Sequence, residues 1–156
     1  MQCTTINIYG EGISFSSAAN FARNMNQIRY EVFFESDRSR QMRGCAGLNK
    51  QHFNLIISYS GESDFAIRVA KLLRQNKRIS LSITNERENR LMHCTTHHLM
   101  VARMEEQIAT GGISNMCSNI AIMFVLDMIY AGVFQRHYEE NKQLVREMGE
   151  LQHIWF

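Results

Sequence analysis

Two short segments rich in glycine and serine combine the residue types that bind anions. The first reads GEGIS at residues 10–14, and the second reads SYSGES at residues 58–63. Glycine lets the backbone approach a ligand closely and adopt positive φ, while serine offers a hydroxyl donor without adding charge. Each segment follows an apolar, strand-like run and opens a segment of helical periodicity, so helix N-terminal N–H groups would join the hydroxyls. Together the two segments predict a site for a small phosphorylated ligand.

The elements that must position these segments alternate along the chain. Apolar or alternating runs predict strands, and recurrence at helical spacing predicts helices. We expect strands at 4–9, 30–34, 53–57, 78–83 and 97–101. We expect helices from Ser14 (as N-cap) to Met25, at 38–50, after the second segment to Leu73, briefly at 88–92, from Asn115 or Ser118 to Phe134, and at 137–151.

Strand and helix in alternation with short connections predict an α/β fold, a three-layer sandwich around a mostly parallel sheet. No linker or repeat divides the chain, so residues 1–156 form one expected domain. Ligands of such sheets bind outside the carboxyl ends of the strands, where both glycine/serine segments would lie.

Composition narrows the class of protein. The 17 basic and 15 acidic residues are spread along the chain, which does not fit the concentrated basic face of a nucleic-acid binder. The four cysteines, Cys3, Cys45, Cys94 and Cys117, are far apart and are expected to be reduced thiols of a cytoplasmic protein. The N-terminus lacks the basic and apolar regions of a secretory signal.

The most apolar stretch, residues 120–134, has Asp127 in its middle and is predicted to be too short to cross a bilayer. We expect a buried helix with no membrane role. Its apolar residues surround nearly the whole circumference, and such a helix needs cover on all sides. In a domain of this size a partner subunit would supply part of that cover, which predicts a homodimer or a higher homo-oligomer.

Three interpretations of the glycine/serine segments compete. A dinucleotide site is suggested by Gly10-x-Gly12 and by Glu35 after the next strand, but Phe15 stands where the third glycine belongs. A P-loop is excluded, because neither segment has the Gly-Lys-Ser/Thr ending. A neutral, hydroxyl-rich phosphate cradle fits best. The alternative that these serines only cap helices and fill turns stays open.

The chain resembles the SIS (sugar isomerase) domain in these segments and in Ile83-Thr84-Asn85. Within that superfamily it is most similar to the C-terminal effector domain of RpiR/MurR-type transcriptional regulators. Asp37-x-Ser39 stands where those regulators commonly have Asp-x-His, and residues 118–121 with Leu126-Asp127 resemble their closing helix. The resemblance covers roughly residues 4–140.

The resemblance implies a five-stranded parallel sheet, a sugar-phosphate ligand and self-association. By position it assigns the ligand to Gly12, Ser14, Ser58, Tyr59, Ser60, Gly61 and Ser63. The three serines of the second segment and the Gly61 amide would hold the phosphate. Asn119 and Ser39 replace the usual arginine and histidine, and residues 89–91 lack the common Ser-Pro-Leu. These departures affect the sugar half of the site more than the phosphate half.

The resemblance also bears on DNA. RpiR-type regulators carry an N-terminal helix-turn-helix domain, whereas here the first strand is expected within a few residues of Met1. We therefore expect no helix-turn-helix domain in this chain, and DNA contact only through a separate domain. The chain is either an excised effector domain or a stand-alone protein.

An isomerase would need a base held against the substrate carbon. Glu105 and Glu106 are the candidates, with solvated loop charges as the alternative. A metal site at His93, Cys94, His97 and His98 is disfavoured, because adjacent strand residues point to opposite faces. Without a clear acid–base pair, we predict no catalytic residue, metal or cofactor. The favoured function is a sensor of a phosphorylated sugar, with aldose–ketose isomerisation or an interaction module with an empty pocket as alternatives.

Overall fold

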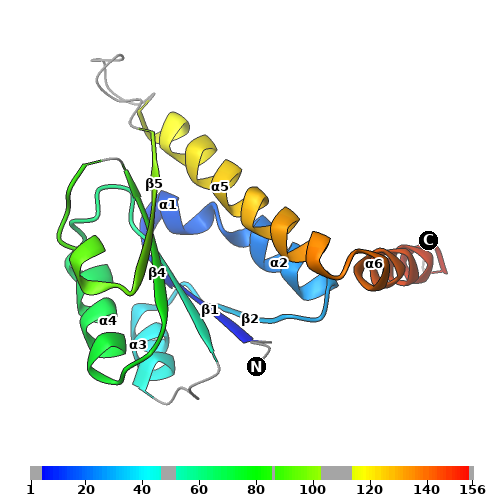
Figure 1. Cartoon of the computed structure of the whole chain (residues 1–156), viewed down its shortest axis with the longest axis horizontal. Helices are drawn as coiled ribbons and strands as arrows, with labels where there is room; N and C mark the ends of the chain where they lie inside the picture. The colour runs from blue at the N-terminus through cyan, green and yellow to red at the C-terminus, as the bar shows by residue number, and fades with distance from the viewer. Residues whose placement is uncertain (1–4, 47–51, 86, 103–113, 155–156) are drawn as a thin grey trace.

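A five-stranded sheet forms the centre of the computed structural model, which describes residues 5–46, 52–85, 87–102 and 114–154. All neighbouring strands pair in parallel, in the order β2-β1-β3-β4-β5. The strands are β1 (Thr5–Gly10), β2 (Glu31–Phe34), β3 (Phe53–Ile57), β4 (Ser80–Asn85) and β5 (His97–Val101). Helices cover both faces (Figure 1). The predicted three-layer α/β fold is confirmed.

Each face of the sheet has its own apolar core. The first core joins Ile6 and Ile8 of β1 to helices α1 (Gly12–Ser16), α2 (Ala19–Gln27) and α5 (Ser114–Arg136). The second joins Tyr9 and Ile56 to helices α3 (Arg38–Ala46) and α4 (Asp64–Gln75). Alternate residues of a strand point to opposite faces, which is how β1 serves both cores. The central strands are buried on both sides, as their apolar runs predict.

The helix predicted from Ser14 is two helices, α1 and α2, separated at Ser17–Ala18. Its expected N-cap is wrong, because Glu11 occupies that position and Ser14 lies inside α1. The break has a local cause. The Ser16 hydroxyl donates to the Ile13 carbonyl at 2.7 Å, and that of Ser17 donates to the same oxygen at 3.3 Å. Serine side chains that bond nearby backbone in this way compete with the helix.

The remaining elements differ from expectation mainly at their ends. Helix α3 ends at Ala46, and the rest of the predicted helix lies outside the described residues. The short helix predicted at 88–92 is a 3₁₀ turn, η1, at Met92–Cys94. The last helix, α6, spans Tyr138–Ile154 and extends away from the sheet (Figure 1).

Helix α5 departs most from expectation, because it is not buried. Ile122 and Leu126 enter the first core, but Ile120, Phe124 and Met128 are 62%, 65% and 58% exposed. The length argument was also wrong, since Ser118–Arg136 is long and apolar enough to cross a bilayer by length and composition alone. One such helix is only a weak indication of a membrane, because the core helices of soluble proteins pass the same test.

Candidate functional site

Both glycine/serine segments follow adjacent strands at the same edge of the sheet. The first follows β1 and the second follows β3, with Gly10 paired in register with Ile57. A Cβ atom at Gly10 would lie 2.6 Å from the Ile57 carbonyl oxygen, so only glycine permits this approach. The predicted meeting of the two loops at the carboxyl edge is therefore present.

Glu11 joins the first loop to the second. The Ser63 hydroxyl donates to Glu11 Oε1 at 2.5 Å, and the Arg38 guanidinium forms an ion pair with Glu11 Oε2. The backbone just before Glu11 is fixed by buried Gln41 of α3. Its Oε1 accepts from the Gly10 N–H, and its Nε2 donates to the Gly10 carbonyl, both at 3.0 Å. The first loop is thus tied to both α3 and the start of α4.

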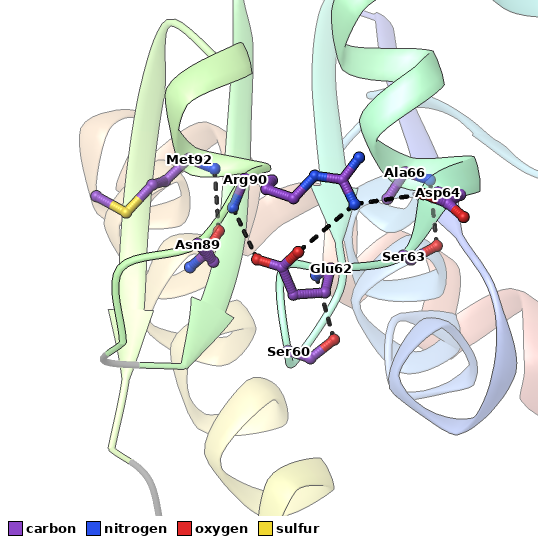
Figure 2. Close-up of polar contacts among 8 residues, drawn as sticks. All are labelled: Ser60, Glu62, Ser63, Asp64, Ala66, Asn89, Arg90 and Met92. Carbon is purple, nitrogen blue, oxygen red and sulfur yellow. Dashed lines mark hydrogen bonds and ion pairs between the residues drawn. The ribbon is translucent and has the colours of Figure 1, made fainter.

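The second loop turns tightly into α4. Gly61 has a φ of +68°, and its N–H donates to the Ser58 carbonyl at 2.9 Å. The Ser63 oxygen accepts from the Ala66 N–H at 3.2 Å, which makes Ser63 the N-cap of α4. The Ser60 hydroxyl is exposed and accepts from the Glu62 N–H at 3.2 Å (Figure 2).

The connection between β4 and β5 clamps this loop from the side. A Cβ on Gly61 would lie 2.1 Å from Asn89 Oδ1, so Asn89 fills the space beside the glycine. Asn89 donates to Thr84 Oγ1 at 3.0 Å and accepts from the Met92 N–H at 3.0 Å. The Leu91 N–H donates to the Gly61 carbonyl at 3.0 Å. The loop is therefore held by contacts from the β4–β5 connection in addition to its own hydrogen bond between Gly61 and Ser58.

Arg90 adds a charged side chain to the contacts that Asn89 and Leu91 make with the second loop. Its N–H donates to Glu62 Oε1 at 2.9 Å, and its guanidinium lies 3.7 Å from Glu62 Oε2 and 3.5 Å from Asp64 Oδ1 (Figure 2). All three side chains are exposed, so each pair contributes little to stability. Their effect is to neutralise two of the carboxylates that surround the loop.

The seven predicted ligand residues occupy different environments. Ser58 and Tyr59 are buried, with the Ser58 N–H bonded to the Ile83 carbonyl and the Tyr59 carbonyl bonded to the Asn85 N–H. Gly12 and Ser60 are exposed, and Ser14 is half-buried on α1. Within the part of the chain that the structure describes, Glu11 rather than Ser14 bridges the two loops.

A hollow of about 670 Å³ opens beside Glu11 and the start of α4. Its walls come from the first loop, α3 and α4, and the lining residues are Glu11, Arg38, Ser39, Met42, Arg43, Asp64, Phe65 and Arg68. Sequence reasoning missed Glu11, Arg38 and Arg68. Two sequence features pointed to this region, the first glycine/serine segment, which contains Glu11, and the Asp37-x-Ser39 motif. Three arginines and two carboxylates line the hollow, so its lining has a small excess of positive charge.

The other sequence candidates are engaged elsewhere or lie outside the described residues. Glu35, the acid of the dinucleotide interpretation, accepts from Arg40 at 3.0 Å, and that hydrogen bond lowers the pKa of Glu35. Burial raises the pKa of the Cys45 thiol to about 11, so it is a poor nucleophile at neutral pH. Glu105 and Glu106 lie outside the described residues, as does Cys3.

The residues at which the sequence disfavours a metal site do not form a ligand cluster. His97 and His98 are both exposed on β5, an edge strand, and His93 Nε2 lies 3.1 Å from Glu88 Oε1. Over the described ranges, no three His, Cys, Asp or Glu side chains are grouped so that they would hold a metal ion.

Solved structures share this fold over most of the chain. The NanR protein of Vibrio vulnificus, complexed with ManNAc-6P, aligns with a TM-score of 0.85 and 21% identity over 99% of this chain. The alignment covers 57% of the NanR chain, so this chain spans little more than half of that protein. The sugar isomerase domain of an RpiR transcription factor from Sphaerobacter thermophilus aligns with a TM-score of 0.78 and 14% identity, over 96% of this chain and 80% of that one.

A third similar structure is MJ1247 of Methanococcus jannaschii, for which a 3-hexulose-6-phosphate isomerase function was inferred. It aligns with a TM-score of 0.67 and 15% identity, over 94% of this chain and 77% of that one. Identities this low establish the fold alone. No curated protein matches the chain by sequence. The sequence profile of the SIS domain matches residues 1–131, and the chain therefore belongs to the SIS domain family.

Proposed function

We propose that this SIS domain is the sugar-phosphate sensor of an RpiR-type transcriptional regulator of carbohydrate metabolism, acting in the cytoplasm without catalysis. The observation that carries the proposal is the meeting of two glycine/serine loops at the N-terminus of α4. A helix N-terminus with hydroxyl donors stabilises a phosphate group. DNA would be contacted through a separate helix-turn-helix domain.

The proposed ligand residues are Gly12, Ser14, Ser58, Tyr59, Ser60, Gly61 and Ser63. Ser60 is the most accessible hydroxyl of the second loop and is free to turn its proton toward a phosphate oxygen. The Gly61 N–H already donates to Ser58, so it would reach a phosphate only if that turn opened. The hydroxyls therefore carry more of the proposed binding than the Gly61 amide does.

Non-catalytic binding fits the carboxylates around the loops. Glu11 is paired with Arg38, and Glu62 and Asp64 are paired with Arg90. An isomerase needs a base that is free to take a proton from a sugar carbon. These three carboxylates are engaged by arginines, which favours a binding role for this edge of the sheet.

We also propose that a homodimer forms through α5. Its exposed apolar side chains, Ile120, Phe124 and Met128, lie on the side away from the sheet. A ligand would act by favouring one arrangement of subunits over another.

The test of the sensor function is a thermal-shift screen with sugar phosphates, amino-sugar phosphates and acidic sugars, followed by calorimetric titration. A ligand at a hundredfold excess over its Kd should stabilise the protein by about 2.7 kcal/mol. Ser60→Ala should lose about 1.5–3 kcal/mol of binding, since it removes a hydrogen bond to a charged group. The absence of any thermal shift across the panel would instead favour an interaction module with an empty pocket.

Sugar-phosphate isomerisation is the second candidate, because MJ1247 shares the fold. A coupled assay with hexose and pentose phosphates separates the two functions. Turnover that is abolished by Glu105→Gln or Glu106→Gln would establish the enzyme and overturn the sensor proposal.

A further inference from the structure

We propose that Glu11 determines the affinity and selectivity of the serine loop, because its carboxylate occupies the position that a ligand phosphate must take. A phosphorylated ligand then binds only by displacing Glu11 from Ser63 and taking over Arg38. This inference rests on the proposed function and concerns the regulation of the same site.

The first argument is the hydrogen-bond capacity of Ser63. A serine hydroxyl has one proton to donate. That proton is given to Glu11 Oε1 at 2.5 Å, while the oxygen accepts from the Ala66 N–H. Ser63 can therefore donate to a phosphate only after Glu11 has left, whereas its capping bond to Ala66 is unaffected by the exchange.

The second argument is the charge at this position. Glu11 places a carboxylate against the N-cap of α4, where the helix dipole stabilises negative charge. The Glu11 side chain is 29% exposed, so its repulsion of an approaching dianion is only partly screened by water. A carboxylate and a phosphate cannot share the same donors there. Neutral sugars lack the charge to replace Glu11, which makes the phosphate group the determinant of binding.

The third argument is that the cation remains when the carboxylate leaves. Arg38 pairs with Glu11, and its guanidinium also lies over the Phe65 ring, 5.6 Å from the centroid. Phe65 is a buried residue of the first turn of α4. This cation–π contact holds Arg38 beside the loop independently of Glu11. The arginine is thus positioned to pair with the incoming phosphate.

The fourth argument is space for the displaced side chain. Glu11 lines the hollow of about 670 Å³ described above, together with Arg43 and Arg68. Either arginine offers a new partner for the carboxylate. Because Arg38 is the first residue of α3, the exchange would also change a contact at the start of that helix. Ligand binding would in this way be transmitted from the loop to α3.

The test compares calorimetric affinities for inorganic phosphate and for N-acetylmannosamine 6-phosphate. Glu11→Gln should bind both probes about tenfold more tightly than the wild type, since about 1.4 kcal/mol corresponds to a factor of ten. Asp64→Asn is the matched control. It removes the same charge next to Ser63, from a side chain that is 79% exposed, whereas the Ser63 hydroxyl donates to Glu11. Asp64→Asn should change affinity less than twofold. Arg38→Gln should lower the affinity for both probes about tenfold.

Four outcomes overturn the proposal. Weaker binding by Glu11→Gln would mean that Glu11 contacts the ligand rather than competing with it. Equal gains in affinity for Glu11→Gln and Asp64→Asn would mean that the effect comes from the overall charge near the loop and not from the position of Glu11. Unchanged affinity in Glu11→Gln, with binding still lost in Ser60→Ala, would reject the role of Glu11 and leave the sensor function standing. If neither the wild type nor Glu11→Gln binds either probe, the role of Glu11 is rejected, and the thermal-shift panel decides separately whether the sensor function stands.

Discussion

The carboxyl edge of the sheet and the outer face of α5 differ in whether their side chains find partners within the chain. At the sheet edge, polar groups of five residues of the second loop, Ser58, Tyr59, Gly61, Glu62 and Ser63, have partners from β4, the β4–β5 connection or the first loop. On α5, large apolar side chains remain exposed. A region completed within one chain can bind a ligand by itself. An uncovered apolar face indicates a second surface, and the proposed homodimer supplies it.

The largest expected effect is a loss of unfolding free energy in the second loop, and it separates steric packing from backbone strain. Gly61→Ala should cost about 3 kcal/mol of unfolding free energy, because its φ is positive and its Cβ would collide with Asn89. Gly12→Ala is the matched control, with a φ of +65° but no neighbour within 4 Å of its Cβ, and should cost about 1 kcal/mol. Urea denaturation measures both. Equal losses would show that Asn89 does not clamp the loop.

The next effect concerns the α5 face alone. Phe124→Glu should weaken the proposed dimer by about 2 kcal/mol, which is typical of a central aromatic at an interface. The unfolding free energy of the monomer should change by less than about 0.5 kcal/mol, because Phe124 is exposed in the single chain. Sedimentation across a concentration series measures the dimer. If the wild type stays monomeric at tens of micromolar, the outer face of α5 is not a dimer interface.

The smallest effect is expected at Arg90. Arg90→Gln removes exposed ion pairs to Glu62 and Asp64 and should lower the unfolding free energy by about 0.5 kcal/mol at low salt. The loss should shrink as ionic strength rises, because exposed charges are screened. Denaturation at two salt concentrations checks this. A loss of several kcal/mol that is independent of salt would show that the clamp depends on Arg90 rather than on Asn89.

The sequence predicted the sheet well, because each strand is a local apolar or alternating run such as residues 53–57. It failed where a distant partner decides the outcome. Nothing near Glu11 in sequence reveals that its side chain meets Ser63, 52 positions away. The pattern of α5 reports apolar side chains but not whether the same chain covers them. The α1–α2 break was hidden because Phe15, Ala18 and Ala22 keep helical spacing across it.

Gln41 imposes a chemical restriction on α3. Strand β2 ends opposite Ile8, so the peptide at Gly10 has no further strand on that side, and the Gln41 amide takes its place with one acceptor and one donor. A side-chain amide is the functional group that imitates a peptide in this way. A carboxylate at position 41 would repel the Gly10 carbonyl oxygen. An ammonium group would offer no acceptor to the Gly10 N–H. Evolution or engineering of this helix must therefore keep glutamine at this position or rebuild the turn that carries Glu11.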